Sequence, residues 1–272
     1  MLRAESAPLE KPIQLLRPSV MNTSVKQRPP GLILATDLDG TFLGGSEAQR
    51  QALYRDLERR DDVLLIFVTG RDVDFLRGLV QQPGMPQPDL IIGDVGTSVW
   101  DTATWEPIEA LEQDIRTLWN DANARVLDLL ADEPGLTLQP TPFRHRVSYY
   151  YDPQQLRQET LRKVEEAGFD WLLSADTYFD VLPRGVQKGP TLLRLIERLN
   201  LAAERVLVAG DTLNDLSLFK TGLKGVAVGN SERKLLEAIE GFDWVHRARG
   251  EGAAGIAEAI RHFGLHEEED TA

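Results

Sequence analysis

The chain has 272 residues, 42% of them hydrophobic, which is enough to bury the core of one large domain or two small ones. Its net charge of −13 disfavours nucleic acid as a main partner, because a duplex carries dense negative charge of its own. The absence of cysteine excludes disulfides and cysteine nucleophiles and fits a reducing, cytoplasmic location. No apolar run approaches the roughly 20 residues that a membrane helix needs, so we expect no membrane association.

Composition sets the two ends apart from the rest of the chain. Residues 1–30 contain five prolines and lack the apolar stretch of a secretion signal, so we expect a flexible leader there. Residues 266–272 are mostly acidic, and we expect them to form a solvated tail.

Short apolar runs recur along the chain without regular alternation of polar residues, which predicts strands buried on both faces of a parallel sheet. Amphipathic helical stripes follow at residues 192–199, 235–239 and 256–263, and we expect Ser231 to cap the second of these helices. This alternation predicts a Rossmann-like, doubly wound α/β domain. The apolar runs are residues 32–35, 63–68, 90–92, 206–209 and 226–228.

The middle of the chain has a different pattern. Helical spacing continues almost unbroken from residue 108 to residue 129, and a β-type run follows at 146–151. A helix over 154–167 and a strand over 177–182 complete the block. We therefore predict a small α+β domain at residues 105–183, inserted into a core formed by residues 31–104 and 184–265.

The first strand ends in Asp37-Leu38-Asp39-Gly40-Thr41, which places two carboxylates two residues apart. Such a pair can divide the work of phosphate chemistry: Asp37 attacks phosphorus and Asp39 protonates the leaving oxygen. A polar turn is the simpler alternative. A calcium loop is excluded, because Phe42 and Ala48 stand where such a loop needs glycine and glutamate.

Thr69-Gly70-Arg71 follows the second strand and offers a hydroxyl, a backbone N–H and a guanidinium to a phosphate group. Arg71 can equally pair with a neighbouring carboxylate such as Asp72 or Asp74. Lys188 begins a predicted helix, where its charge adds to the positive end of the helix dipole.

A fourth fragment, Gly210–Asp215, brings two carboxylates and an amide to the end of another strand. Asp211 and Asp215 can act together with Asp37 as ligands of a Mg²⁺ ion, because Mg²⁺ prefers carboxylate and phosphate oxygens. An ordinary helix cap is the alternative for this fragment.

These fragments occur in the order of the motifs of the haloacid-dehalogenase superfamily, which the chain resembles over residues 32–263. The predicted inserted domain lies between the second and third motifs, and in this the chain resembles the branch of the superfamily that has an α/β cap domain of the second type. Within it the chain is similar to sucrose-phosphatase-type and Cof-type sugar-phosphate phosphatases. Two departures, Ser98 in place of glutamate and Gly40 in place of asparagine, leave the sugar open. The likeness to the sucrose-phosphatase type rests on Asp37–Thr41, Thr69–Arg71, Gly96-Thr97, Asp180–Pro183, Lys188-Gly189 and Gly210–Asp215.

The resemblance implies that Asp37 forms an aspartyl-phosphate and that Asp39 acts as acid and then as base. It further implies that Mg²⁺ is held by Asp37, the backbone carbonyl of Asp39 and Asp211, with Asp215 nearby. The phosphoryl oxygens would be held by Thr69 with Gly70, Lys188 and Asn214.

The resemblance also implies that the cap closes over the site and selects the leaving group, a phosphorylated sugar such as sucrose 6-phosphate, mannosylfructose phosphate or glucosylglycerate phosphate. We expect substrate contacts from Arg71, Arg146, Tyr149, Asp180 and Arg184, with core packing as the alternative for the tyrosine. A phosphomannomutase-like phosphotransferase and a non-catalytic binding module are the alternative functions. The sequence leaves the oligomeric state open.

Overall fold

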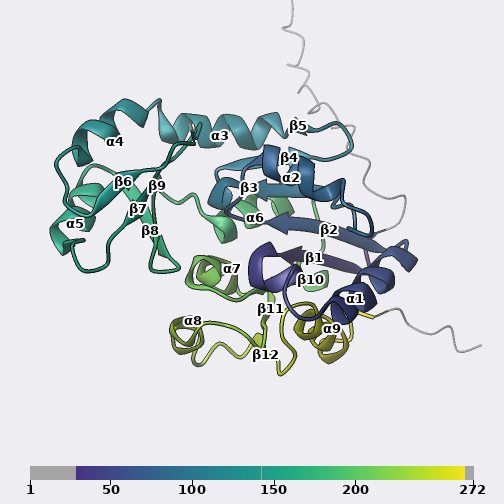
Figure 1. Cartoon of the computed structure of the whole chain (residues 1–272). Helices are drawn as coiled ribbons and strands as arrows, with labels where there is room; N and C mark the ends of the chain where they lie inside the picture. Colours follow the sequence, from purple (N-terminus) through teal and green to yellow (C-terminus); the bar gives the residue numbers. More distant parts are fainter. Residues whose placement is uncertain (1–28, 142, 267–272) are drawn as a thin grey trace, which may run out of the picture.

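The computed structural model describes residues 29–141 and 143–266, shown in colour in Figure 1. Except for residues 29, 30 and 266, the expected leader and acidic tail lie outside the described residues. Among the described residues, no helix has both the length and the apolar character needed to cross a bilayer.

The core is an eight-stranded sheet in the order β12-β11-β10-β1-β2-β3-β4-β5 (Figure 1). Strands β12 to β3 are parallel, whereas β4 and β5 add an antiparallel edge. The central strands are buried throughout, as the continuous apolar runs predict. The bounds are β1 (Leu32–Thr36), β2 (Val63–Val68), β3 (Leu90–Gly93), β4 (Ser98–Asp101), β5 (Glu106–Pro107), β10 (Val206–Gly210), β11 (Lys224–Ala227) and β12 (Val245–Arg247).

Helices cover both faces of this sheet. Leu32 and Leu34 of β1 pack toward α1, α2 and α9, while Ile33 and Ala35 pack toward α3, α6, α7 and α8. Successive strand residues point to opposite faces, so a continuous apolar run feeds two hydrophobic cores. The helices are α1 (Glu47–Arg59), α2 (Val73–Val80), α3 (Glu109–Trp119), α6 (Lys188–Arg198), α7 (Leu216–Phe219), α8 (Arg233–Ala238) and α9 (Ala253–His262).

A second domain, the cap, is inserted between β5 and α6. It holds a four-stranded antiparallel sheet in the order β6-β7-β9-β8. The doubly wound α/β fold with an inserted α+β domain is thus confirmed, whereas the exact domain boundaries stay a prediction. The cap elements after α3 are α4 (Asn123–Leu130), β6 (Leu136–Leu138), β7 (Val147–Tyr151), α5 (Gln158–Glu166), β8 (Phe169–Ser174) and β9 (Tyr178–Pro183).

The two faces of the cap sheet differ. Val147 and Tyr149 of β7, with Phe179 and Val181 of β9, pack against Trp119 and other helical side chains in the cap's own core. The opposite face, which we call the open face, carries the alternate residues of the same strands: Ser148 pairs with Asp180, and Tyr150 with Tyr178.

Several local elements differ from the sequence expectation. The predicted helix over 108–129 is broken into α3 and α4 at Asn120 and Asp121, which both adopt left-handed backbone conformations that these residue types tolerate. Helix α5 begins at Gln158 rather than at residue 154. Strands β6 and β8 were not predicted, because β6 has only three residues and β8 mixes apolar and charged residues without a clear period.

The prediction that Ser231 is the N-cap residue of the helix over 235–239 is wrong. Helix α8 begins at Arg233 after Glu232, without a side-chain cap, and the Ser231 hydroxyl is buried with no hydrogen-bond partner among the described residues.

A buried carboxylate, Glu133, ties the turn before β6 to α5. It accepts hydrogen bonds from Thr160 and Lys163, and from Arg157 at 3.0 Å. Burial alone would raise the pKa of Glu133, but these hydrogen bonds outweigh burial and lower it to about 2.

We therefore expect Glu133 to stabilise the folded cap above about pH 4.5, with this contribution lost as pH falls toward about 2, because the folded pKa lies below the ordinary value of 4.5. Glu133→Gln should lower the free energy of unfolding at pH 7 by roughly 2–3 kcal/mol, measured by urea denaturation. The difference from the wild type should shrink as the pH is lowered to 3. Glu166→Gln, at an exposed position of α5, is the control; equal losses in both variants would contradict the assignment.

Candidate active site

The sequence motifs meet at one edge of the core sheet. Strands β10, β1 and β2 are parallel neighbours, so Asp211, Asp37 and Thr69, which follow them, emerge side by side at their carboxyl ends. This edge is where open α/β sheets place their ligands.

The chain after β1 makes one wide turn, residues Leu38–Phe42, in which the Phe42 N–H donates to the Asp37 carbonyl at 3.1 Å. Gly40 has φ +80°, and a Cβ at this position would lie 2.1 Å from Asp211 Oδ2. Thr41 Oγ1 donates to Asp211 Oδ1 at 2.9 Å. The glycine therefore allows the turn to approach Asp211, and the threonine fixes that carboxylate.

Lys188, the first residue of α6, is fully buried and joins the motifs. Its Nζ lies 2.6 Å from Asp37 Oδ1, 2.7 Å from Asp215 Oδ1 and 2.9 Å from Asn214 Oδ1. Three acceptors match the three N–H donors of an ammonium. The other oxygen of Asp215 accepts the backbone N–H groups of Asp211 and Thr212.

Three buried carboxylates, those of Asp37, Asp211 and Asp215, offer oxygens that all lie within 4.8 Å of one another, and no other such group occurs in the described part of the chain. Among the residues that the structure describes, Lys188 is the one ammonium that contacts Asp37 and Asp215. The cluster thus holds more negative than positive charge, and its donors are the oxygens that a hard divalent cation prefers.

The pKa values reflect this imbalance. Burial raises the pKa of Asp37, and the charges of Asp215 and Asp211 add to this while Lys188 opposes it. Burial and then Asp215 raise the pKa of Asp211 to about 7. Burial would lower the pKa of Lys188, but the carboxylates of Asp215 and Asp37 raise it instead, so the ammonium stays charged.

Asp39 is not part of this cluster and pairs with Arg71. The guanidinium Nε lies 2.8 Å from one carboxylate oxygen and Nη2 lies 3.1 Å from the other, with both side chains about half exposed. Arg71 also lies over the ring of Phe75, 4.5 Å from its centroid. The Asp72 side chain does not pair with Arg71 but accepts the Phe75 N–H at the start of α2.

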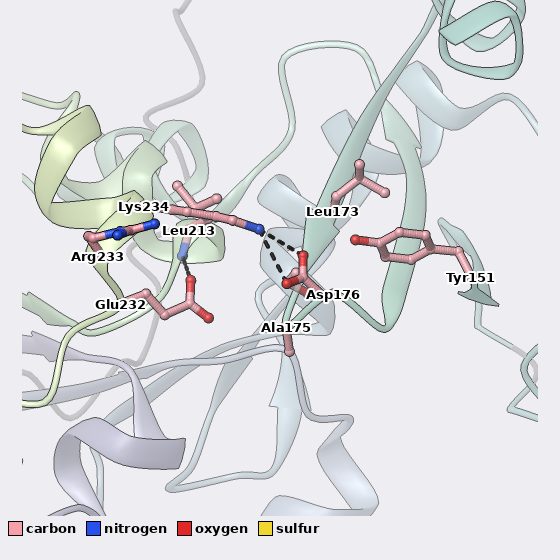
Figure 2. A pocket seen from close by; sticks show the side chains of 9 residues that line it. Tyr151, Leu173, Ala175, Asp176, Leu213, Glu232, Arg233 and Lys234 are labelled. Carbon is pink, nitrogen blue, oxygen red and sulfur yellow. Dashed lines mark hydrogen bonds and ion pairs between the residues drawn. The ribbon is translucent and has the colours of Figure 1, made fainter. Parts of the chain in front are cut away.

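The cap contacts the core on either side of this edge. Just before β7, Arg146 donates to Asp180 Oδ1 at 2.8 Å, to the Gly70 carbonyl at 3.1 Å and to Asp94 Oδ1 at 3.4 Å. At the tip of the β8–β9 hairpin, Asp176 pairs with Lys234 of α8 at 2.9 Å beside a cavity of about 400 Å³ (Figure 2). Arg146 and Asp180, expected to contact substrate, are buried and paired with each other.

The other two residues expected to contact substrate make their contacts with residues of the cap. Tyr149 is buried in the cap core near Phe179, and its hydroxyl has no partner among the described residues. Arg184 donates to the Glu165 carbonyl and lies 3.9 Å from Asp170.

Asn230 is a site residue that sequence reasoning missed. Its Nδ2 donates to the Gly40 carbonyl at 2.9 Å and lies 3.5 Å from Asp211 Oδ2, while its Oδ1 accepts the Gly252 N–H. It follows the apolar run at 226–228, so the rule that identified the other motifs, a polar residue after a buried strand, also applies to it.

A family model described as Sucrose-6F-phosphate phosphohydrolase matches residues 30–264. The mannosylfructose-phosphate phosphatase of Agrobacterium fabrum is 30% identical over 247 residues, covering 87% of this chain and 98% of that protein. The glucosylglycerol-phosphate synthase of Pseudomonas anguilliseptica is 42% identical over 235 residues, covering 86% of this chain and 31% of the synthase. The chain therefore spans less than a third of the synthase.

The crystal structure of the sucrose-phosphatase from Synechocystis sp. PCC6803 in complex with sucrose and phosphate has the same fold, with a TM-score of 0.78 and 28% sequence identity. The match covers 86% of this chain and 98% of that one. Because the family model and these relatives span both the core and the cap, the chain belongs to the sucrose-6F-phosphate phosphohydrolase family and is a haloacid-dehalogenase-type phosphohydrolase.

Proposed function

We propose that this protein hydrolyses the phosphate monoester of a sugar through an aspartyl-phosphate formed on Asp37, with Mg²⁺ as cofactor. One observation carries the proposal: Asp37, at the end of β1, is held by the buried Lys188 and lies within the carboxylate cluster completed by Asp211 and Asp215. Oriented cations around a transferring phosphoryl group are the main source of catalysis in this type of reaction.

In the first step an Asp37 oxygen bonds to phosphorus, the bond to the sugar oxygen breaks, and Asp39 gives that oxygen a proton. In the second step Asp39 takes a proton from water, whose oxygen bonds to phosphorus while the bond to Asp37 breaks. Thr69, with the Gly70 N–H, Lys188 and Asn214 would hold the phosphoryl oxygens. In this structure Arg71 pairs with both carboxylate oxygens of Asp39, which is the arrangement of the ionised acid that accepts the proton in the second step.

Mg²⁺ would be held by Asp37, the Asp39 carbonyl and Asp211, with Asp215 supporting them through Lys188 and the Asp211 N–H. When bound, the ion supplies positive charge to the phosphoryl oxygens. The donor set fits this ion, because the carboxylates of the cluster exceed its one ammonium in charge.

The names of the relatives support the proposal that the leaving group is a glycosyl compound. Their names refer to mannosylfructose phosphate, glucosylglycerol phosphate and sucrose. We therefore propose as substrate a phosphate ester of a disaccharide or glycosyl compound: sucrose 6-phosphate, mannosylfructose phosphate, glucosylglycerate phosphate or glucosylglycerol phosphate. The 42% identity to the Pseudomonas synthase makes glucosylglycerol phosphate the first ester to test.

A screen of phosphorylated monosaccharides, disaccharides and glycosyl compounds tests this function. We expect free phosphate from at least one glycosyl ester, with a higher kcat/KM than for monosaccharide phosphates, measured by a phosphate-release assay. Chromatography of the sugar product separates hydrolysis from transfer. Recovery of an isomeric sugar phosphate without free phosphate would establish a mutase instead.

Asp37→Asn should lower kcat for phosphate release by at least about 10³-fold, because the amide is a poor nucleophile and no aspartyl-phosphate can form. Steady-state kinetics measures the loss, and Asp74→Asn, at a highly exposed position of α2, serves as the control. Turnover of Asp37→Asn comparable to the wild type would rule out the nucleophile assignment.

Chelation of divalent cations should reduce phosphate release to background, and added Mg²⁺ should restore it, because the cluster then regains the positive charge it lacks. Asp211→Asn should raise the Mg²⁺ concentration needed for half-maximal activity roughly 10-fold or more, since it removes one anionic ligand. Full activity after exhaustive chelation would show that the reaction needs no metal.

A further inference from the structure

The open face of the cap sheet carries a pair of half-exposed tyrosines. Tyr150 of β7 and Tyr178 of β9 are cross-strand partners, their ring centroids lie 5.9 Å apart, and each is 42% exposed. Large aromatic side chains bury much apolar area when they find a partner, so two exposed rings on one sheet face mark a surface suited to a ligand.

The topology places this pair over the edge of the core sheet where the strands that precede Asp37 and Asp211 end. On one side of it along the cap strands, Arg146, which is paired with Asp180, donates to the carbonyl of Gly70, a residue that follows β2. On the other side, Asp176 at the hairpin tip reaches Lys234, which follows β11. In the core sheet, β1 and β10 lie between β2 and β11. The tyrosine pair is thus held opposite the ends of β1 and β10, where Asp37 and Asp211 lie.

Core residues near the same edge of the sheet support this placement. The pKa of Arg71 is raised chiefly by its hydrogen bond to Asp39, and the charge of an ionised Tyr178 side chain adds to the effect, so Tyr178 lies near the Arg71–Asp39 pair. Phe75, 40% exposed, lies under the same guanidinium. An apolar surface therefore adjoins the carboxylate that would protonate the leaving oxygen.

The neighbouring tyrosines serve other purposes. Tyr149 is in the cap core, and Tyr151 points toward Asp176 at the hairpin tip (Figure 2). Of the run Tyr149–Tyr151, only Tyr150 shares the open face with Tyr178, because successive strand residues alternate between faces.

We propose that Tyr150 and Tyr178 form the subsite for the sugar ring of the leaving group, with the ring's C–H face lying against the two aromatic rings. This inference rests on the proposed function and adds the residues that select a cyclic over an open-chain ester. A pyranose presents apolar C–H groups on its faces and hydroxyls at its edge. Tyrosines match this pattern, because their rings are apolar and their hydroxyls are polar.

The test is a ratio of two kcat/KM values, for the best glycosyl phosphate from the screen and for glycerol 2-phosphate, which has no ring. In Tyr150→Leu and Tyr178→Leu this ratio should fall roughly 3- to 10-fold each, the loss expected for one aromatic contact. Tyr150→Phe and Tyr178→Phe should keep the ratio within about twofold, since the aromatic ring remains. Leu138→Ser is the matched control: Leu138 is half exposed but pairs with Tyr149 and so belongs to the other face of the cap sheet.

A ratio unchanged in both leucine variants, or reduced equally in Leu138→Ser, would overturn the subsite. If the wild type cleaves glycerol 2-phosphate but no glycosyl ester, the proposed sugar substrate itself fails, and the subsite fails with it. The two failures are separate results, because one is read from the variants and the other from the wild type. Calorimetric titration of the glycosyl ester into Asp37→Asn, with and without Tyr178→Leu, should show the same loss of affinity without turnover.

Discussion

The site depends on one electrostatic constraint: among the described residues, a cluster of three buried carboxylates contains one buried ammonium, which contacts two of them. Lys188 holds Asp37 and Asp215 at hydrogen-bonding distance, while Asp211 is fixed by Thr41 rather than by a cation. Burying this much negative charge is costly unless further positive charge arrives. The same imbalance that disfavours the cluster in isolation suits it to a divalent cation and, through that ion, to a phosphate ester.

The backbone around the cluster follows from this constraint. Gly40 has no side chain where a Cβ would collide with Asp211, and Asn230 bridges the turn after β1 to the start of α9. Asp215 uses one oxygen for Lys188 and the other for two backbone N–H groups. Groups outside the cluster therefore orient the carboxylates of Asp211 and Asp215, while Lys188 orients that of Asp37.

Two of the contacts between the cap and the core differ in character. Arg146 and Asp180 form a buried pair that reaches a backbone carbonyl of the core, whereas Asp176 and Lys234 form an exposed pair. Buried, hydrogen-bonded pairs are costly to break one partner at a time, while exposed pairs contribute little. The Arg146–Asp180 pair is therefore the harder of the two to break, and the Asp176–Lys234 pair the easier. The open face of the cap sheet lies between them.

The sequence by itself determined the chemistry of the core edge. Asp37, Thr69, Lys188 and Asp211 each follow or begin an element marked by local apolar patterns, and parallel strands bring such positions to one edge whatever the details of packing. Only the tertiary structure decided which side chains of the cap face the core sheet and which are buried inside the cap. Whether Tyr149 or Tyr150 faces the core, and whether Arg146 meets a substrate or Asp180, depends on strand register and on which face the helices cover. Those are long-range contacts, and a local pattern of alternation is compatible with either face.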